Sequence, residues 1–179
     1  FESREADKGQ KTRLVSVGFT DLLGDFVFIF LDIDGVLNDH TPQESRYCGT
    51  NPSCVSQFNR LLSLLPESKI VISSAWRYMI LKGELTLRGF EMLLLTHGVC
   101  CFGRVVGHTK ADGAIEDEPH HHDEPERWRQ AGMKWRASQI REWMADNGHG
   151  SFVVLDDLEI DLPELHLVNG AVGLTRNDV

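Results

Sequence analysis

The chain has 179 residues, of which 41% are apolar and 25% are charged, and its formal net charge is −9. These values are typical of a soluble globular protein of one domain, large enough to bury about two-thirds of its unfolded surface. No apolar run approaches the roughly 20 residues that cross a bilayer, and no segment resembles a signal peptide, so a membrane protein is excluded and we expect a cytoplasmic one.

Residues 1–25 are predicted to form an N-terminal tail and lead-in. Residues 1–12 are polar and charged, which indicates disorder. Residues 14–19 are a candidate for a short strand or a loop. The chain begins with Phe rather than Met, as a processed form or a fragment does.

An apolar run over residues 26–31 ends in two carboxylates, Asp32 and Asp34, followed by Gly35. The run is rich in Phe and Ile and predicts a strand buried on both faces. Open α/β sheets place ligand sites at the carboxyl ends of strands, where a charge is costly unless something uses it. Because Mg²⁺ prefers one or two carboxylates with water and phosphate oxygens, the pattern predicts a magnesium site. A simple Asp-Gly turn is the alternative.

A polar loop or flap is predicted over residues 38–51, followed by a helix over residues 53–65. Apolar side chains recur there at helical spacing and form one core-facing stripe: Val55, Phe58, Leu61, Leu62 and Leu65. A second buried strand over residues 69–72 ends in the hydroxyls of Ser73 and Ser74 and continues into Ala75-Trp76-Arg77.

A helix is predicted over residues 85–97, with Gly98 as its C-terminal stop, and a short strand over residues 104–106. An acidic, His-rich loop follows at about residues 108–130. Residues 111–126 hold seven acids and no Lys or Arg, so any repulsion of nucleic acid arises mostly from this run. The adjacent His120, His121 and His122 cannot all point one way, so we favour a solvated loop over a catalytic metal site.

The last elements are a helix over residues 137–147, a strand over residues 152–155 that ends in Asp156 and Asp157, and a final strand over residues 166–168. Strands that alternate with helices predict an α/β fold, with a mainly parallel sheet covered on both sides. Ser73 follows Asp34 by only 39 positions, which leaves no room for a large inserted cap. We therefore expect a single domain over residues 26–179.

The four cysteines show no metal-binding spacing and are expected to be free thiols: Cys48, Cys54, Cys100 and Cys101.

The order of these features resembles the haloacid dehalogenase-like (HAD) superfamily: a DxD motif, a hydroxyl at a strand end, a basic residue near a helix start, then paired acids. The segments SSAWR at 73–77, LDD at 155–157 and the tail at 166–175 look most like the HAD domain of Swiss Army Knife RNA repair proteins. The resemblance covers about residues 26–176. It implies a Rossmann-like three-layer sandwich, HAD-like and without a large cap domain.

The resemblance also implies roles for the acids. Asp32 would attack phosphorus and become an aspartyl-phosphate, while Asp34 would protonate the leaving oxygen and then activate water. The Asp32 and Asp156 carboxylates, with the Asp34 main-chain carbonyl, would hold Mg²⁺. Asp157 would fix a metal-bound water.

The resemblance implies that the Ser73 hydroxyl donates a hydrogen bond to a phosphoryl oxygen. Ser74 is the alternative, although its other role is to cap the following turn. The basic residue is Arg136 or Lys134, since both precede the predicted helix at residue 137, and the alignment favours Arg136. The alternative role, which must hold for at least one of the two and could hold for both, is to solvate the start of a helix.

Two further residues are candidates for substrate binding. Arg77 could reach the substrate from the loop after the second strand. Trp76 could stack on a base, as aromatic side chains do with single strands. Ordinary packing beneath the loop is the favoured alternative for Trp76.

The function that these features predict is a Mg²⁺-dependent phosphatase acting through an aspartyl-phosphate. An open site cannot exclude water by itself, and capless HAD enzymes commonly act on macromolecules, which favours a polynucleotide end or a phosphoprotein over a small metabolite. The expected phosphorylated substrates are nucleic-acid ends or nucleotides. The alternatives are a small-molecule phosphatase of the nucleotidase type and a catalytically silent HAD scaffold that binds a partner. A dehalogenase is disfavoured because those enzymes lack the second aspartate, which is Asp34 here. The oligomeric state stays open.

Overall fold

The computed structural model describes residues 27–39, 49–110, 125–148 and 150–179. The expectations for residues 1–25, for Cys48 and most of the flap, and for most of the acidic His-rich loop lie outside these ranges. Within them, Cys54, Cys100 and Cys101 are free thiols. No helix in this part of the chain is both long and apolar enough to cross a membrane.

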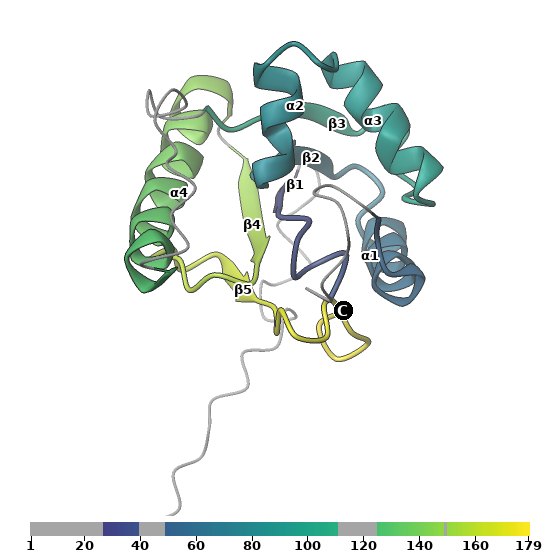
Figure 1. The fold of residues 1–179 in the computed structure, drawn as a ribbon. Coiled ribbons are helices and arrows are strands. Elements are labelled where there is room, and N and C mark those ends of the chain that lie inside the picture. The colour runs from purple at the N-terminus through teal and green to yellow at the C-terminus, as the bar shows by residue number, and fades with distance from the viewer. Residues whose placement is uncertain (1–26, 40–48, 111–124, 149) are drawn as a thin grey trace, which may run out of the picture.

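A five-stranded parallel sheet forms the centre of the molecule (Figure 1). Its strands lie in the order β3-β2-β1-β4-β5. Their bounds are β1 Val27–Leu31, β2 Lys69–Ile72, β3 Val105–His108, β4 Ser151–Asp156 and β5 Leu165–Leu167. The chain builds β2 and β3 on one side of β1, then crosses to build β4 and β5 on the other. This reversal creates a topological switch point between β1 and β4, where open α/β sheets bind their ligands.

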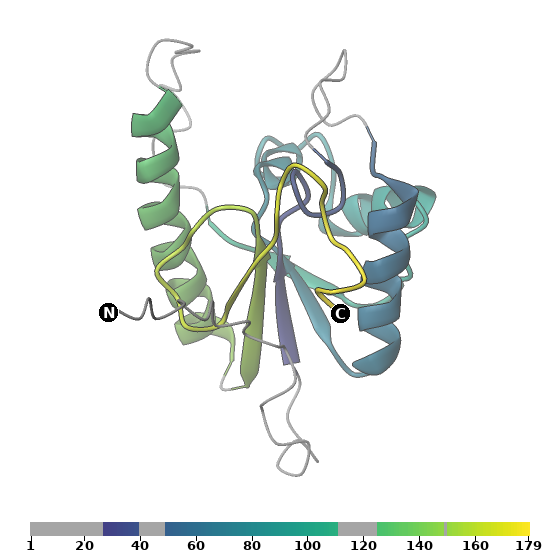
Figure 2. The ribbon, with the colours of Figure 1, turned by 90° about the horizontal axis from the view of Figure 1, so that it is seen from below.

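Helices cover both faces of the sheet, as Figure 2 shows with α4 on one side and α1 on the other. On the first face, α1 (Pro52–Leu64) and α3 (Leu87–Thr96) pack against the larger hydrophobic cluster. On the second face, α4 (Pro125–Asn147) contributes Ile140 and Trp143 to a smaller cluster. The α/β three-layer fold is therefore confirmed, and the described residues include no large cap.

Side-chain alternation along the strands separates these two clusters, because successive residues point to opposite faces of a sheet. Phe30, Val71 and Val154 belong to the cluster on the α4 face. Leu31, Ile72 and Leu155 follow them on β1, β2 and β4 and belong to the cluster on the other face. The next residue on each strand must therefore point towards α4 again.

Two helical features differ from the sequence prediction. The helix predicted to begin at residue 137 begins twelve residues earlier, at Pro125, and this also shortens the loop predicted over residues 108–130. The apolar stripe begins only at Ala137, so periodicity detects the packed half of the helix and misses the rest. The short helices η1 (Ala75–Arg77) and α2 (Tyr78–Leu81) were also not predicted. The remaining elements differ by one or two residues at their ends, apart from β3, which extends to His108.

Candidate active site

Four polar side chains lie in one row across the carboxyl edge of the sheet. Leu31 pairs with Ile72 and with Leu155, and Ile72 pairs with His108. The residues that follow these partners are therefore neighbours on the α4 face, and all of them are buried: Thr109, Ser73, Asp32 and Asp156. The row runs across the switch point between β1 and β4.

Arg136 of α4 joins the two acids of this row. Its Nη1 lies 2.6 Å from Asp32 Oδ2, and 2.9 and 2.7 Å from Asp156 Oδ1 and Oδ2. The side chain of Arg136 is 14% exposed, while those of Asp32 and Asp156 are 6% and 0% exposed. One guanidinium therefore neutralises part of the charge on two buried carboxylates.

The electrostatics of this group follow from burial and from mutual repulsion. Burial, together with the negative charge on Asp32, raises the pKa of Asp156, and the Arg136 guanidinium only partly opposes this. Burial disfavours the charged form of Arg136, but Asp32 and Asp156 outweigh it and raise the pKa of the guanidinium. Within the described residues, the Arg136 guanidinium is the cation bonded to both carboxylates, so it balances only part of their charge.

A divalent cation would supply the missing charge. Asp32, Asp156 and Asp157 each offer one carboxylate oxygen, and these oxygens lie within 4.8 Å of one another. An all-oxygen donor set suits Mg²⁺ rather than a softer metal. The residues present therefore fit the expected ion. The backbone also fixes the Asp32 carboxylate, because the Ile33 amide donates a hydrogen bond to its Oδ1 at 2.8 Å.

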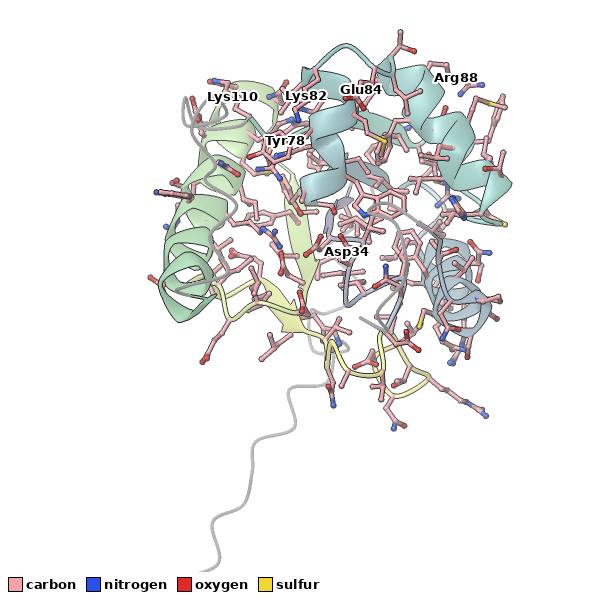
Figure 3. The ribbon with its side chains drawn as sticks, viewed as in Figure 1. Asp34, Tyr78, Lys82, Glu84, Arg88 and Lys110 are labelled. Carbon is pink, nitrogen blue, oxygen red and sulfur yellow. The ribbon has the colours of Figure 1, made fainter. Side chains whose placement is uncertain are left out.

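Asp34 belongs to a separate group of contacts, in the turn that follows β1. The Asn38 side-chain amide donates to Asp34 Oδ1 at 2.9 Å, and the Trp76 indole donates to Asp34 Oδ2 at 2.9 Å. The turn requires a glycine after Asp34, because Gly35 has a φ of 74°. Figure 3 labels Asp34, whose side chain lies below α2.

The two serines after β2 have different environments. Ser74 Oγ accepts a hydrogen bond from the Trp76 amide at 3.3 Å and so caps η1. This is the capping role that the sequence analysis gave as the alternative to phosphate binding. Ser73 Oγ is buried and has no hydrogen-bond partner among the described residues. A buried hydroxyl without a partner costs free energy, so Ser73 has an unused donor next to Asp32.

The two side chains proposed to contact the substrate, Trp76 and Arg77, are both buried. Trp76 is 1% exposed, and a buried ring has no free face on which to stack a base. Arg77 is 5% exposed and donates from Nη1 to the Ser73 and Ser74 carbonyls, at 3.2 and 2.8 Å. Its Nη2 donates to Gln139 Oε1 of α4 at 3.2 Å. Arg77 therefore ties the end of β2 to α4 instead of facing solvent.

Of the two basic candidates, the structure places Arg136 against the acids, inside α4 rather than before a helix. Lys134 lies in the same helix, but its side chain is outside the described part of the chain.

The sequence analysis did not identify three residues near the site: Asn38, Gln139 and Thr109. Asn38 lies four residues after Asp34, a spacing that fits a turn and could have identified it. The positions of Thr109 and Gln139 follow only from strand register and helix packing.

Comparison with known proteins gives one result. The family model described as the HAD domain in Swiss Army Knife RNA repair proteins matches residues 28–179. No curated protein and no solved structure matches the chain.

Proposed function

The chain belongs to the family of HAD domains in Swiss Army Knife RNA repair proteins, and from this premise we propose that it is a Mg²⁺-dependent phosphatase acting through an aspartyl-phosphate. The observation that carries the proposal is the bridge from Arg136 to Asp32 and Asp156 at the switch point of the sheet. A phosphoryl group carries negative charge, so it needs positive charge at the point where a carboxylate attacks it.

In the proposed reaction, an oxygen of Asp32 attacks phosphorus and the bond from phosphorus to the ester oxygen breaks. Asp34 gives its proton to the departing oxygen, so the products are an alcohol and a phosphorylated Asp32. Asp34 then takes a proton from water as that water attacks phosphorus, which releases inorganic phosphate and restores both acids.

The other residues supply binding and charge. Arg136 is bonded to Asp32 and would face the charge that gathers on the phosphoryl oxygens. The hydroxyl of Ser73 would donate to one of those oxygens, which would satisfy a donor that is otherwise buried without a partner. Asp32, Asp156 and Asp157 would hold Mg²⁺, with the Asp34 carbonyl as a further ligand, and the ion would neutralise charge on the phosphoryl group.

The proposed substrate is a phosphorylated end of a nucleic acid, with a mononucleotide as the small-molecule alternative. The RNA repair family supports this class, and so does the absence of a cap among the described residues. A site without a cap relies on a large substrate to exclude water.

The test is hydrolysis of phosphorylated oligonucleotides, mononucleotides, phosphopeptides and an aryl phosphate, with EDTA and then with added Mg²⁺. We expect activity only with Mg²⁺ and the highest kcat/KM on oligonucleotide ends. Asp32→Asn should abolish turnover and the hydroxylamine-sensitive phosphoenzyme, while the outward-facing Arg141→Met should retain both. Full activity in EDTA would show that hydrolysis does not require Mg²⁺ and would contradict this part of the proposal.

The same substrate panel separates the alternatives. Preference for mononucleotides or other small esters would favour a small-molecule phosphatase. If a well-folded protein hydrolyses none of the esters with Mg²⁺ present, the HAD scaffold is catalytically silent and the proposed function is wrong.

A further inference from the structure

We propose that Trp76 and Asn38 are positioning residues that aim the Asp34 carboxyl at the leaving oxygen of the substrate. This inference rests on the proposed function, because it gives Asp34 the role of proton donor. It assigns a purpose to the buried indole of Trp76, which is too enclosed to contact a substrate. It also assigns one to Asn38, which sequence reasoning did not identify.

Each oxygen of Asp34 accepts one hydrogen bond, and the two donors come from different parts of the chain. Asn38 lies in the same turn as Asp34, and its Nδ2 is 2.9 Å from Asp34 Oδ1. Trp76 comes from η1 after β2, and its Nε1 is 2.9 Å from Asp34 Oδ2. A carboxylate held at both oxygens cannot rotate freely about its last side-chain bond. Its remaining acceptor positions are left for the proton that it exchanges.

Both donors are themselves fixed. The Gly35 amide donates to Asn38 Oδ1 at 2.8 Å, so the carbonyl side of the Asn38 amide faces Gly35 and its NH₂ group faces Asp34. The Trp76 ring belongs to the larger hydrophobic cluster and is 1% exposed. Ser74 caps the turn that carries it. The hydrogen-bond donors are therefore held by packing before any substrate arrives, as a preorganised site requires.

The charges of the partners separate the two aspartates of the DxD motif. Asp32 is paired with the cationic Arg136, which lies where the negative charge of a phosphoryl group would gather. The two partners of Asp34 that donate these hydrogen bonds are neutral. The two donors fix the direction of the Asp34 carboxyl group, because each holds one of its oxygens. This division matches the two roles, nucleophile and proton carrier.

The test compares leaving groups. p-Nitrophenolate departs without a proton, whereas the hydroxyl of a ribose or of glycerol needs one as its bond to phosphorus breaks. A well-placed general acid contributes about 10²- to 10⁴-fold to such steps. Trp76→Phe keeps a buried ring but removes the N–H. We expect its kcat/KM to fall at least about tenfold more for a phosphorylated oligonucleotide than for p-nitrophenyl phosphate.

Two controls separate positioning from general damage. Trp143→Phe removes another buried indole, on α4 against Phe28 and Phe30, and should affect both esters equally. In an Asp34→Asn background, Trp76→Phe should cost little more on the oligonucleotide, because a residue that acts through Asp34 has nothing left to position. Asn38→Ala should repeat the leaving-group preference of Trp76→Phe.

Three outcomes would overturn the inference. An equal loss on both esters would make Trp76 a packing residue only, and so would additive effects with Asp34→Asn. If Trp76→Phe is too unstable to assay, the same comparison of esters with Asn38→Ala decides whether the hydrogen-bond donors to Asp34 position its carboxyl group. If the wild-type protein hydrolyses neither ester, the proposed function fails and the positioning role fails with it. If the wild type hydrolyses both esters but the variants show no preference between the two leaving groups, only the positioning role is wrong.

Discussion

Arg136 is the residue on which the charge balance of the site depends. Its guanidinium is the described positive group that bonds both Asp32 and Asp156. Two carboxylates that share a buried site repel each other, and removing one partner of a buried ion pair costs about 3–5 kcal/mol. The stability of the metal-free protein should therefore depend strongly on the Arg136 side chain.

We predict that Arg136→Met lowers the free energy of unfolding by about 3–5 kcal/mol in EDTA, and that Mg²⁺ restores part of the loss because it binds the folded state. Urea unfolding with and without Mg²⁺ measures both effects. Arg141 is the matched control, since it is exposed and donates to the Asp161 carbonyl at 2.7 Å. Arg141→Met should change stability by less than about 0.5 kcal/mol. Equal stabilities of the two variants in EDTA would contradict the prediction.

Residue types and spacing drew attention to Asp32 and Asp34, whereas Ser73, Arg136 and Asp156 were selected through the resemblance to the HAD superfamily, with Ser74 and Lys134 as alternates. The contacts of Trp76 and Arg77 were not predictable in this way. Both follow β2 closely, but their directions depend on η1 and on the approach of α4. A polar atom on a large side chain near a site is compatible with a substrate contact or with a buried hydrogen bond, and only packing decides between them.

At the scale of the elements, α4 shows why the prediction of helix bounds depends on packing. Ala137, Ile140 and Trp143 face the sheet and give the second half of α4 its periodicity. The first half, from Pro125, has no apolar stripe of that kind, and a proline is well suited to the first turn of a helix. Arg136 lies at the junction of the two halves. This places its guanidinium at the carboxyl edge of the sheet, next to the acids.

The C-terminal segment supports the turn that carries Asp34. The Leu174 amide donates to the Val36 carbonyl at 2.8 Å. Gly173 packs so closely that a Cβ there would lie 2.6 Å from Cys54 Sγ and 2.7 Å from the Asn38 carbonyl oxygen. This contact gives a physical reason for the tail at residues 166–175 to belong to the same unit as the DxD motif.

We predict that Gly173→Ala lowers both stability and activity, because the methyl group would displace the turn with Asn38. Gly83 is a matched control, since it has a similar φ of +73° but no atom within 4 Å of an added Cβ. Gly83→Ala should show only the backbone cost, about 1–2 kcal/mol. Gly173→Ala should exceed that cost in thermal or urea unfolding and should also reduce kcat. Similar losses in the two variants would mean that the close packing at Gly173 has no effect.

A second contact in the same segment predicts a pH dependence. Burial pushes the pKa of Asp178 up, but hydrogen bonds from Thr175 and the proximity of His166 outweigh it and lower the pKa below its ordinary value. A carboxyl with a lowered pKa in the folded state stabilises the protein above its ordinary pKa. That stabilisation is lost as the pH falls through the lowered value.

Asp178→Asn should therefore lower the free energy of unfolding by about 1 kcal/mol near pH 7. The difference from the wild type should shrink as the pH falls below about 4. Urea unfolding across a pH series measures this. Asp161→Asn, at an exposed position, should show no such trend. A difference for Asp178→Asn that stays constant down to pH 3 would contradict the assignment.

At the scale of the whole molecule, no large cap covers the carboxyl edge of the sheet within the described part of the chain, and the net charge is −9. The seven acids of residues 111–126 account for most of that charge. They lie in the chain between β3 and the body of α4, the two elements that carry Thr109 and Arg136 to the edge. An anionic substrate such as RNA would therefore approach a protein whose negative charge is concentrated in one run.

We predict that neutralising Glu116, Asp117 and Glu118 to their amides strengthens binding of a single-stranded oligonucleotide several-fold at low salt. The reason is that fewer negative charges then oppose the phosphates. Because salt screens exposed charges beyond about 10 Å at 0.1 M, the gain should fade as salt rises, and fluorescence anisotropy across a salt series measures this. Glu67→Gln is the control, since this exposed acid precedes β2 at the opposite edge of the sheet. It should produce a smaller gain per charge removed. If the triple variant binds no more tightly at any salt concentration, the acidic run does not oppose nucleic acid. If the control gains as much per charge, the effect belongs to the net charge of the whole molecule and not to the acidic run.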